Sequence, residues 1–192
     1  MTKRMIGIFG STECKIRFSL KIKMLAAALS VALAVTLPQL AHLAGSALGV
    51  GNSIGATLLP MHLPILLVGF LAGPMVGGVA GLLSPCISFL LSGMPVVSAL
   101  PLMMVELAVY GAFCGALKGC KMPLILKLLS AQVLGRLVRA IAAMIIAGTA
   151  GAGAWSSLVD ALVTGMPGLI LQWLLIPVII YVLERYNEKY EH

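Results

Sequence analysis

Charged residues are confined to short stretches of this chain, and long apolar runs separate them. Between Lys23 and Lys118 the only Asp, Glu, Lys or Arg is Glu106. A soluble domain gives each helix or strand a polar face toward water, and this run offers none. The apolar runs are continuous and rich in Leu and Ala, whereas membrane β-strands alternate apolar and polar residues. The pattern therefore predicts an all-α integral membrane bundle.

Glycine and proline divide the apolar sequence into six expected transmembrane helices. A bilayer core of about 30 Å needs about 20 apolar residues per helix, and 192 residues leave no room for a separate soluble domain. We expect a basic cytoplasmic segment at residues 1–23, a six-helix membrane domain at 24–185 and a cytoplasmic tail at 186–192. The expected helices cover residues 24–43, 59–72, 74–91, 95–117, 124–150 and 167–183.

Composition and charge placement agree with this topology. Hydrophobic residues make up 60% of the chain and charged residues 10%, with a mean hydropathy of +1.09. The net charge is +7. Basic residues mark the cytoplasmic side of membrane proteins, and here they cluster in residues 1–23, in the 118–127 loop and near the C-terminus. Both termini are therefore predicted to be cytoplasmic. No patch of interleaved basic and aromatic residues suggests nucleic acid as a partner. A signal peptide with cleavage near 41–47 is the alternative interpretation of the basic start.

The segments expected on the outer face include a glycine-rich loop at residues 45–58, which contains Asn52. Such a loop could close over a pocket or serve as a plain connector. The same face is expected to hold two Gly-Met-Pro turns, at residues 93–95 and 165–167, and a loop with a short interfacial helix at 151–165 around Trp155. We also expect close helix packing where small residues recur four apart, at Ala28 and Ala32 and at glycines 69, 73, 77 and 81.

Three charged side chains are predicted to lie at mid-membrane depth: Glu106, Arg136 and Arg139. An unpaired charge there costs at least about 2.5–3.5 kcal/mol, so these groups should face the bundle interior. One interpretation is a structural ion pair between the fourth and fifth helices. The other is a ligand site, because two arginines against one glutamate leave a positive charge that suits a carboxylate or phosphate. His62 and Gln172 could line the same pocket, although His62 could instead be an interfacial histidine bonded to a carbonyl.

Several motifs are absent from the sequence. It contains no GxxxxGK[ST] phosphate loop, no HExxH and no GxSxG. The chain is therefore not expected to be an enzyme, and no metal or cofactor is predicted. Cys14, Cys86, Cys114 and Cys120 form no CxxC pair and are expected to be free apolar thiols.

Two long stretches carry a resemblance to a known family. They are LLPMHLPILLVGFLAGPMVGGVAGLLSPCISFLLSGMP at 58–95 and PLMMVELAVYG at 101–111, supported by LGRLVRA at 134–140 and TGMPGLILQWLLIPV at 164–178. Together they resemble the substrate-binding S components of energy-coupling factor (ECF) transporters, the vitamin-uptake branch of the ABC transporters. The similarity covers about residues 24–185. The basic stretch before Met24 is longer than the family pattern leads one to expect.

The resemblance implies a six-helix protein of the bacterial cell membrane that captures a vitamin or related precursor at its outer face. It would work with a transmembrane coupling subunit and two cytoplasmic ATPase subunits. Ala28 and Ala32 would contact the coupling subunit, and residues 45–58 would form the lid. The substrate-binding residues would be Asn52, His62, Glu106, Arg136, Arg139 and Gln172. Pantothenate, cobalamin and queuosine precursors are the ligand classes to consider. A stand-alone facilitator or channel is the alternative function, and an intramembrane enzyme is a third class that no motif supports.

Overall fold

The computed structural model describes residues 19–49, 53–147 and 152–190, and the elements formed in these ranges are all helices. Five of these helices are long and apolar enough to cross a membrane. The prediction of an all-α membrane bundle is confirmed at this level. In chain order the elements are α2 (Leu20–Ala47), α3 (Ser53–Leu58), α4 (His62–Ala72), α5 (Pro74–Ser92), α6 (Leu100–Ala116), the 3-10 helix η1 (Leu117–Gly119), α7 (Leu124–Ala147) and α8 (Ala152–Tyr190).

The prediction of six full transmembrane spans is wrong, because the described part of the chain contains five helices long enough to cross a membrane. The segment expected to be the second span forms α4, which has only 11 residues. At 1.5 Å per residue α4 is about 16 Å long, roughly half of a bilayer core. Its expected start at Leu59 is not helical, because Leu59 has a positive φ of 48° and the helix begins only at His62.

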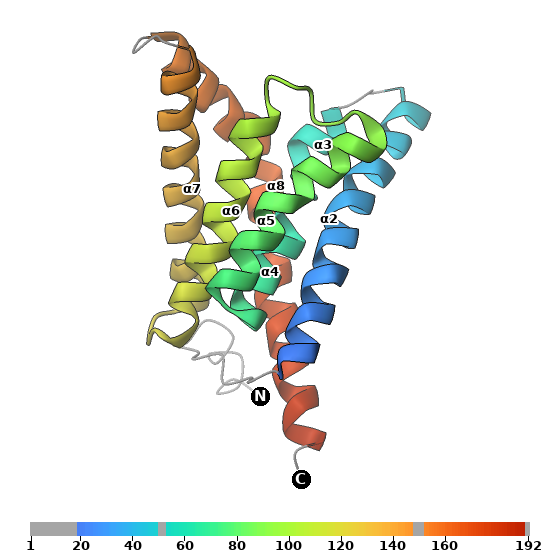
Figure 1. Cartoon of the computed structure of the whole chain (residues 1–192), viewed down its shortest axis with the longest axis vertical. Helices are drawn as coiled ribbons and strands as arrows, with labels where there is room; N and C mark the ends of the chain where they lie inside the picture. The colour runs from blue at the N-terminus through green and yellow to red at the C-terminus, as the bar shows by residue number, and fades with distance from the viewer. Residues whose placement is uncertain (1–18, 50–52, 148–151, 191–192) are drawn as a thin grey trace.

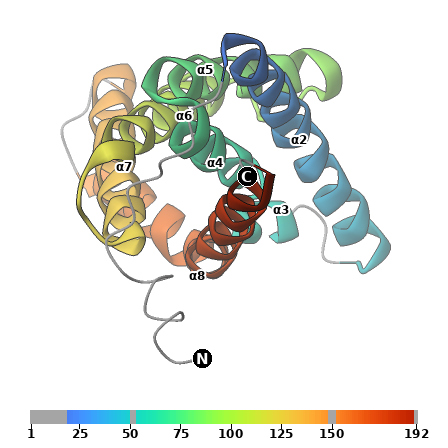
Figure 2. The ribbon, with the colours of Figure 1, turned by 90° about the horizontal axis from the view of Figure 1, so that it is seen from below.

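The helices run alternately up and down the long axis of the bundle (Figure 1). We call the end that holds Leu20 and the last turn of α8 the proximal end, and the opposite end, with α3 and the α5–α6 turn, the distal end. Helix α2 rises to the distal end, α4 descends to the proximal end, and α5, α6, α7 and α8 follow in antiparallel order. Seen from the proximal end, α4 lies between α6 and α8 (Figure 2).

The core of the bundle is built around α4. Eight of its 11 residues are buried, among them Ile65, Leu66 and Phe70. They pack in one cluster with Leu107 and Tyr110 of α6 and with buried residues of α7 and α8. The outer surface carries large exposed apolar side chains along α2, α5, α7 and α8, which suits contact with lipid rather than water.

Glycines allow a close crossing between α5 and α6. A Cβ added at Gly77 would collide with the backbone carbonyl of Gly111, and one added at Gly81 with that of Leu107. The close packing predicted from the four-residue glycine spacing is therefore present. Gly73 has another role, because its φ of 100° makes the turn between α4 and α5.

Three further expectations about the bounds of elements are corrected, two at the distal end and one at the proximal end. In place of the expected loop and interfacial helix at 151–165, residues 152–165 form the first turns of α8, which continues without interruption through the second Gly-Met-Pro sequence. Within the expected loop at 45–58, residues 45–47 belong to α2 and residues 53–58 form α3. Asn52 lies outside the described residues. At the proximal end Lys21 and Lys23, expected in the preceding segment, belong to α2.

Candidate ligand-binding site

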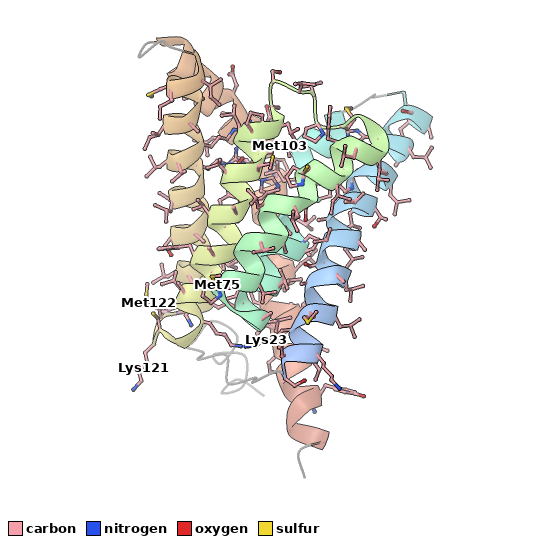
Figure 3. The ribbon with its side chains drawn as sticks, viewed as in Figure 1. Lys23, Met75, Met103, Lys121 and Met122 are labelled. Carbon is pink, nitrogen blue, oxygen red and sulfur yellow. The ribbon has the colours of Figure 1, made fainter. Side chains whose placement is uncertain are left out.

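A cavity of about 480 Å³ lies within the distal half of the bundle. This volume is in the range of small-molecule sites. Met103, which lines it, is labelled in the distal half in Figure 3. The lining residues come from each of the helices α2 to α8 and from the turns before α4 and α6. They are Pro38, His42, Gly55, Leu59, Pro60, Met61, His62, Ser88, Met94, Pro95, Val96, Met103, Arg136, Arg139, Asp160 and Thr164.

The late start of α4 explains why the cavity is there. The neighbouring helices continue to the distal end, whereas α4 begins at His62, and residues 59–62 line the cavity. The first turn of α4 has no side-chain cap at Met61. A helix N-terminus carries partial positive charge from its unpaired N–H groups. This end of the cavity is therefore favourable for negative charge.

Glu106 is the centre of a buried ionic cluster beside the cavity. Its side chain is fully buried, and Arg139 Nη1 donates to Oε2 over 2.7 Å. Arg136 Nε lies 3.1 Å from Oε1, and the Tyr110 hydroxyl donates to Oε1 over 3.0 Å. The predicted pairing of Glu106 with the arginines is thus present, and it involves both of them. Since a single carboxylate faces two guanidinium groups, the cluster carries surplus positive charge.

The two arginines differ in exposure. The side chain of Arg139 is 24% exposed, while that of Arg136 is 7% exposed. Both line the cavity, and Glu106 lies behind them. An anion in the cavity would therefore meet guanidinium groups whose orientation Glu106 fixes, an arrangement suited to carboxylate or phosphate.

His62 is buried and lines the cavity at the first turn of α4. Its ring lies against that of Tyr110, with centroids 5.4 Å apart, and its Nε2 is 3.9 Å from Glu106 Oε1. Neither ring nitrogen has a hydrogen-bond partner in the described structure. The expectation of an interfacial histidine bonded to a carbonyl is therefore wrong. Buried polar atoms without partners are rare and require an explanation.

Gln172 does not line the cavity. It belongs to a chain of hydrogen bonds in which Trp173 Nε1 donates to Gln132 Oε1 over 2.7 Å and Gln132 Nε2 donates to Gln172 Oε1 over 2.9 Å. Gln172 Nε2 then donates to the Leu59 carbonyl over 3.4 Å. The amide thus ties α8 to the turn that forms the cavity wall.

Helix α3 and the following turn cover the cavity from the side of α8. A Cβ at Gly168 would collide with the carbonyl of Leu58, and one at Gly165 would lie 2.8 Å from the Leu59 side chain. The glycines of α8 therefore let this covering segment approach closely. Gly55 of α3 packs in the same way against the His42 ring of α2.

The structure brings together most of the residues predicted to bind substrate. His62, Arg136 and Arg139 line the cavity, Glu106 holds the arginines, and Gln172 holds the Leu59 turn. Sequence reasoning missed His42, Ser88, Asp160 and Thr164 in the wall. One signal was available for Asp160, since it is the only acidic residue between Glu106 and Glu184.

Metal binding finds no support in the described residues, where no group of three or more His, Cys, Asp or Glu could hold an ion. Cys86, Cys114 and Cys120 are free thiols, and Cys14 lies outside the described part of the chain. The described residues form a helical bundle with five helices long and apolar enough to cross a membrane, a cavity in its distal half and a cationic cluster beside that cavity. Comparison of the chain with models of protein families, with characterised proteins and with solved structures finds no match.

Proposed function

We propose that this protein is the substrate-capture subunit of an ECF-type vitamin transporter, as its sequence resemblance implies. The observation that carries the proposal is the distal cavity of about 480 Å³ whose wall holds Arg136 and Arg139 with one buried counter-charge, Glu106. Such a site suits a small oxyanionic nutrient. A cobalamin is far larger than this cavity, so the volume favours the smaller ligand classes.

The charge distribution supports an outward-facing cavity. Apart from Arg136 and Arg139, the basic residues of the described segments lie in the first turn of α2, around η1, in the first turn of α7 and near the end of α8. Figure 3 shows Lys23 and Lys121 at the proximal end. Basic residues favour the cytoplasmic side. The cavity would then open toward the outside, with α3 and the Leu59 turn as its cover.

A groove between α2 and α5 supports the proposed contact with a coupling subunit. Ala28 and Ala32 are exposed and line a groove of about 560 Å³ together with residues of α5 such as Val79 and Leu83. Small residues four apart allow a second helix to approach closely in lipid. ATP hydrolysis would belong to separate subunits.

The proposal is tested with full-length protein purified in detergent without ATP. Small molecules released on denaturation are identified by mass spectrometry, and the affinity of the identified compound is measured by calorimetry. We expect one nutrient at close to equimolar amount in the wild type and at least tenfold weaker binding in Arg139→Gln, because the guanidinium that contacts the ligand is lost. Lys121→Gln is the control, since Lys121 is exposed at the proximal end.

Two outcomes would contradict the proposal. Unchanged affinity in Arg139→Gln and Arg136→Gln would make the arginines purely structural. Uptake that persists in membranes without coupling and ATPase subunits would favour a stand-alone facilitator.

A further inference from the structure

All four charged side chains described in the distal half of the bundle meet at the cavity. Arg136, Arg139 and Asp160 line it, and Glu106 contacts both arginines. The cavity wall thus carries both signs of charge. This pattern restricts the kind of ligand beyond the presence of an anionic group.

Asp160 is available for a ligand. It is exposed, and no ion pair joins it to any basic residue of the described segments. The basic residues other than Arg136 and Arg139 lie at the proximal end, on α2, η1, α7 and α8. Residues 50–52 and 148–158, which adjoin the distal end in sequence, contain no Lys or Arg. Among the described residues Asp160 is therefore open to a positively charged group of a ligand.

The positive and negative groups are separated along α8. A Cβ at Gly165 would lie 3.2 Å from Arg136 Nη2, so the guanidinium reaches α8 at this level. Asp160 comes five residues earlier, which is about 7 Å along the helix axis toward the distal end. Thr164, in the cavity wall, lies between the two levels.

The cavity also offers apolar walls and buried histidine nitrogens without hydrogen-bond partners in the described structure, on His42 and His62. Met61, Val96 and Met103 supply apolar surface. His62 is 2% exposed and both of its ring nitrogens are without hydrogen-bond partners in the described structure. A ligand in the cavity could provide the missing partner.

We infer that the ligand is zwitterionic, with a carboxylate or phosphate at Arg136 and Arg139 and a positively charged nitrogen at Asp160. The inference rests on the proposed function, because it assigns the chemical class of the molecule captured in the same cavity. A simple anion such as pantothenate would satisfy the arginines but leave Asp160 unmatched. An amino-acid-like nutrient or precursor would match both ends.

The test uses two probes of the same length and the same carboxylate, 6-aminohexanoate and 6-hydroxyhexanoate. Their affinities are measured by calorimetry on the full-length protein in lipid nanodiscs. In the wild type we expect the amino probe to bind about three- to fivefold more tightly, the factor of a partly exposed ion pair. In Asp160→Asn the two affinities should become equal. In Arg139→Gln both should weaken, and Lys121→Gln should bind both like the wild type.

The outcomes separate this inference from the proposed function. If the wild type binds the two probes with equal affinity and Arg139→Gln binds neither, the zwitterionic ligand is overturned, whereas the proposed oxyanion site is retained. A preference for the amino probe that survives in Asp160→Asn would overturn the role of Asp160. Absence of binding by either probe, with the nutrient identified by mass spectrometry still bound, would overturn the zwitterionic ligand alone. Circular dichroism checks that each variant is folded, and Asp160→Ser provides a second substitution at the same position.

Discussion

Arg139 Nη1 lies 2.7 Å from Glu106 Oε2, and this charged hydrogen bond joins α7 to α6 inside the bundle. Arg136 reaches the other carboxylate oxygen from the preceding turn of α7. The pair therefore fixes the helix packing and at the same time holds two guanidinium groups at the cavity wall. The contact between Glu106 and the arginines therefore stabilises the bundle and also orients the proposed ligand site.

Glu106→Gln is expected to destabilise the protein by about 3–5 kcal/mol, because it leaves the buried Arg136 and the partly buried Arg139 without their carboxylate. The measurement is reversible unfolding in mixed micelles, followed by circular dichroism. Asp160→Asn is the control, since it removes an exposed carboxylate that forms no ion pair in the described segments. If Glu106→Gln lowers the free energy of unfolding by less than about 1 kcal/mol, the negative charge of Glu106 does not stabilise the cluster.

Gly77→Ala is expected to weaken the contact between α5 and α6, because the new methyl group would collide with the Gly111 carbonyl. Overpacking of this kind costs about 1–3 kcal/mol. The midpoint of thermal unfolding checks it. Gly119→Ala serves as the control, since a Cβ there has no atom within 4 Å. If Gly77→Ala and Gly119→Ala have the same midpoint of thermal unfolding, the close contact between α5 and α6 does not determine stability.

The pattern of charged and apolar residues was sufficient to predict the class of fold and the centre of the site. Glu106, Arg136 and Arg139 stood out because a charge in lipid needs a partner, and they are in contact in the structure. The six-span count failed because hydropathy measures apolar length and cannot detect where a helix begins. Leu59 and Pro60 are as apolar as a helix requires, yet they form a turn that leaves room for the cavity.

The turn predicted at the second Gly-Met-Pro sequence, residues 165–167, is wrong for a related reason. Proline within a helix removes a backbone hydrogen bond and is a reliable stop signal in water. In a membrane bundle, neighbouring helices can satisfy the freed carbonyl, and α8 contains both Pro167 and Pro177. The expected loop and interfacial helix at 151–165 also included Asp160, which is why its position in the cavity wall was not predicted.

Gln172→Leu is expected to loosen the turn that forms the cavity wall. The substitution removes the hydrogen bond to the Leu59 carbonyl and leaves buried Gln132 without its acceptor, at a cost of about 1–3 kcal/mol. Hydrogen exchange should quicken at residues 57–62 by at least about fivefold relative to α5. Gln39→Leu, which removes a hydrogen bond to Ser92 near the surface, is the control. Unchanged exchange at residues 57–62 would show that the turn is held by packing alone.

Lys118→Met is expected to destabilise the proximal end of α4. Lys118 Nζ donates to the Leu71 carbonyl over 2.6 Å, and this carbonyl lies in the last turn of α4, where no intrahelical donor remains. A charged hydrogen bond at a helix C-terminus contributes about 1.5–3 kcal/mol and matches the helix dipole. Unfolding in mixed micelles measures the loss. Lys121→Met removes an exposed lysine three residues away and should change stability by less than about 0.5 kcal/mol. Equal unfolding midpoints for the two variants would mean that α4 does not depend on this cap.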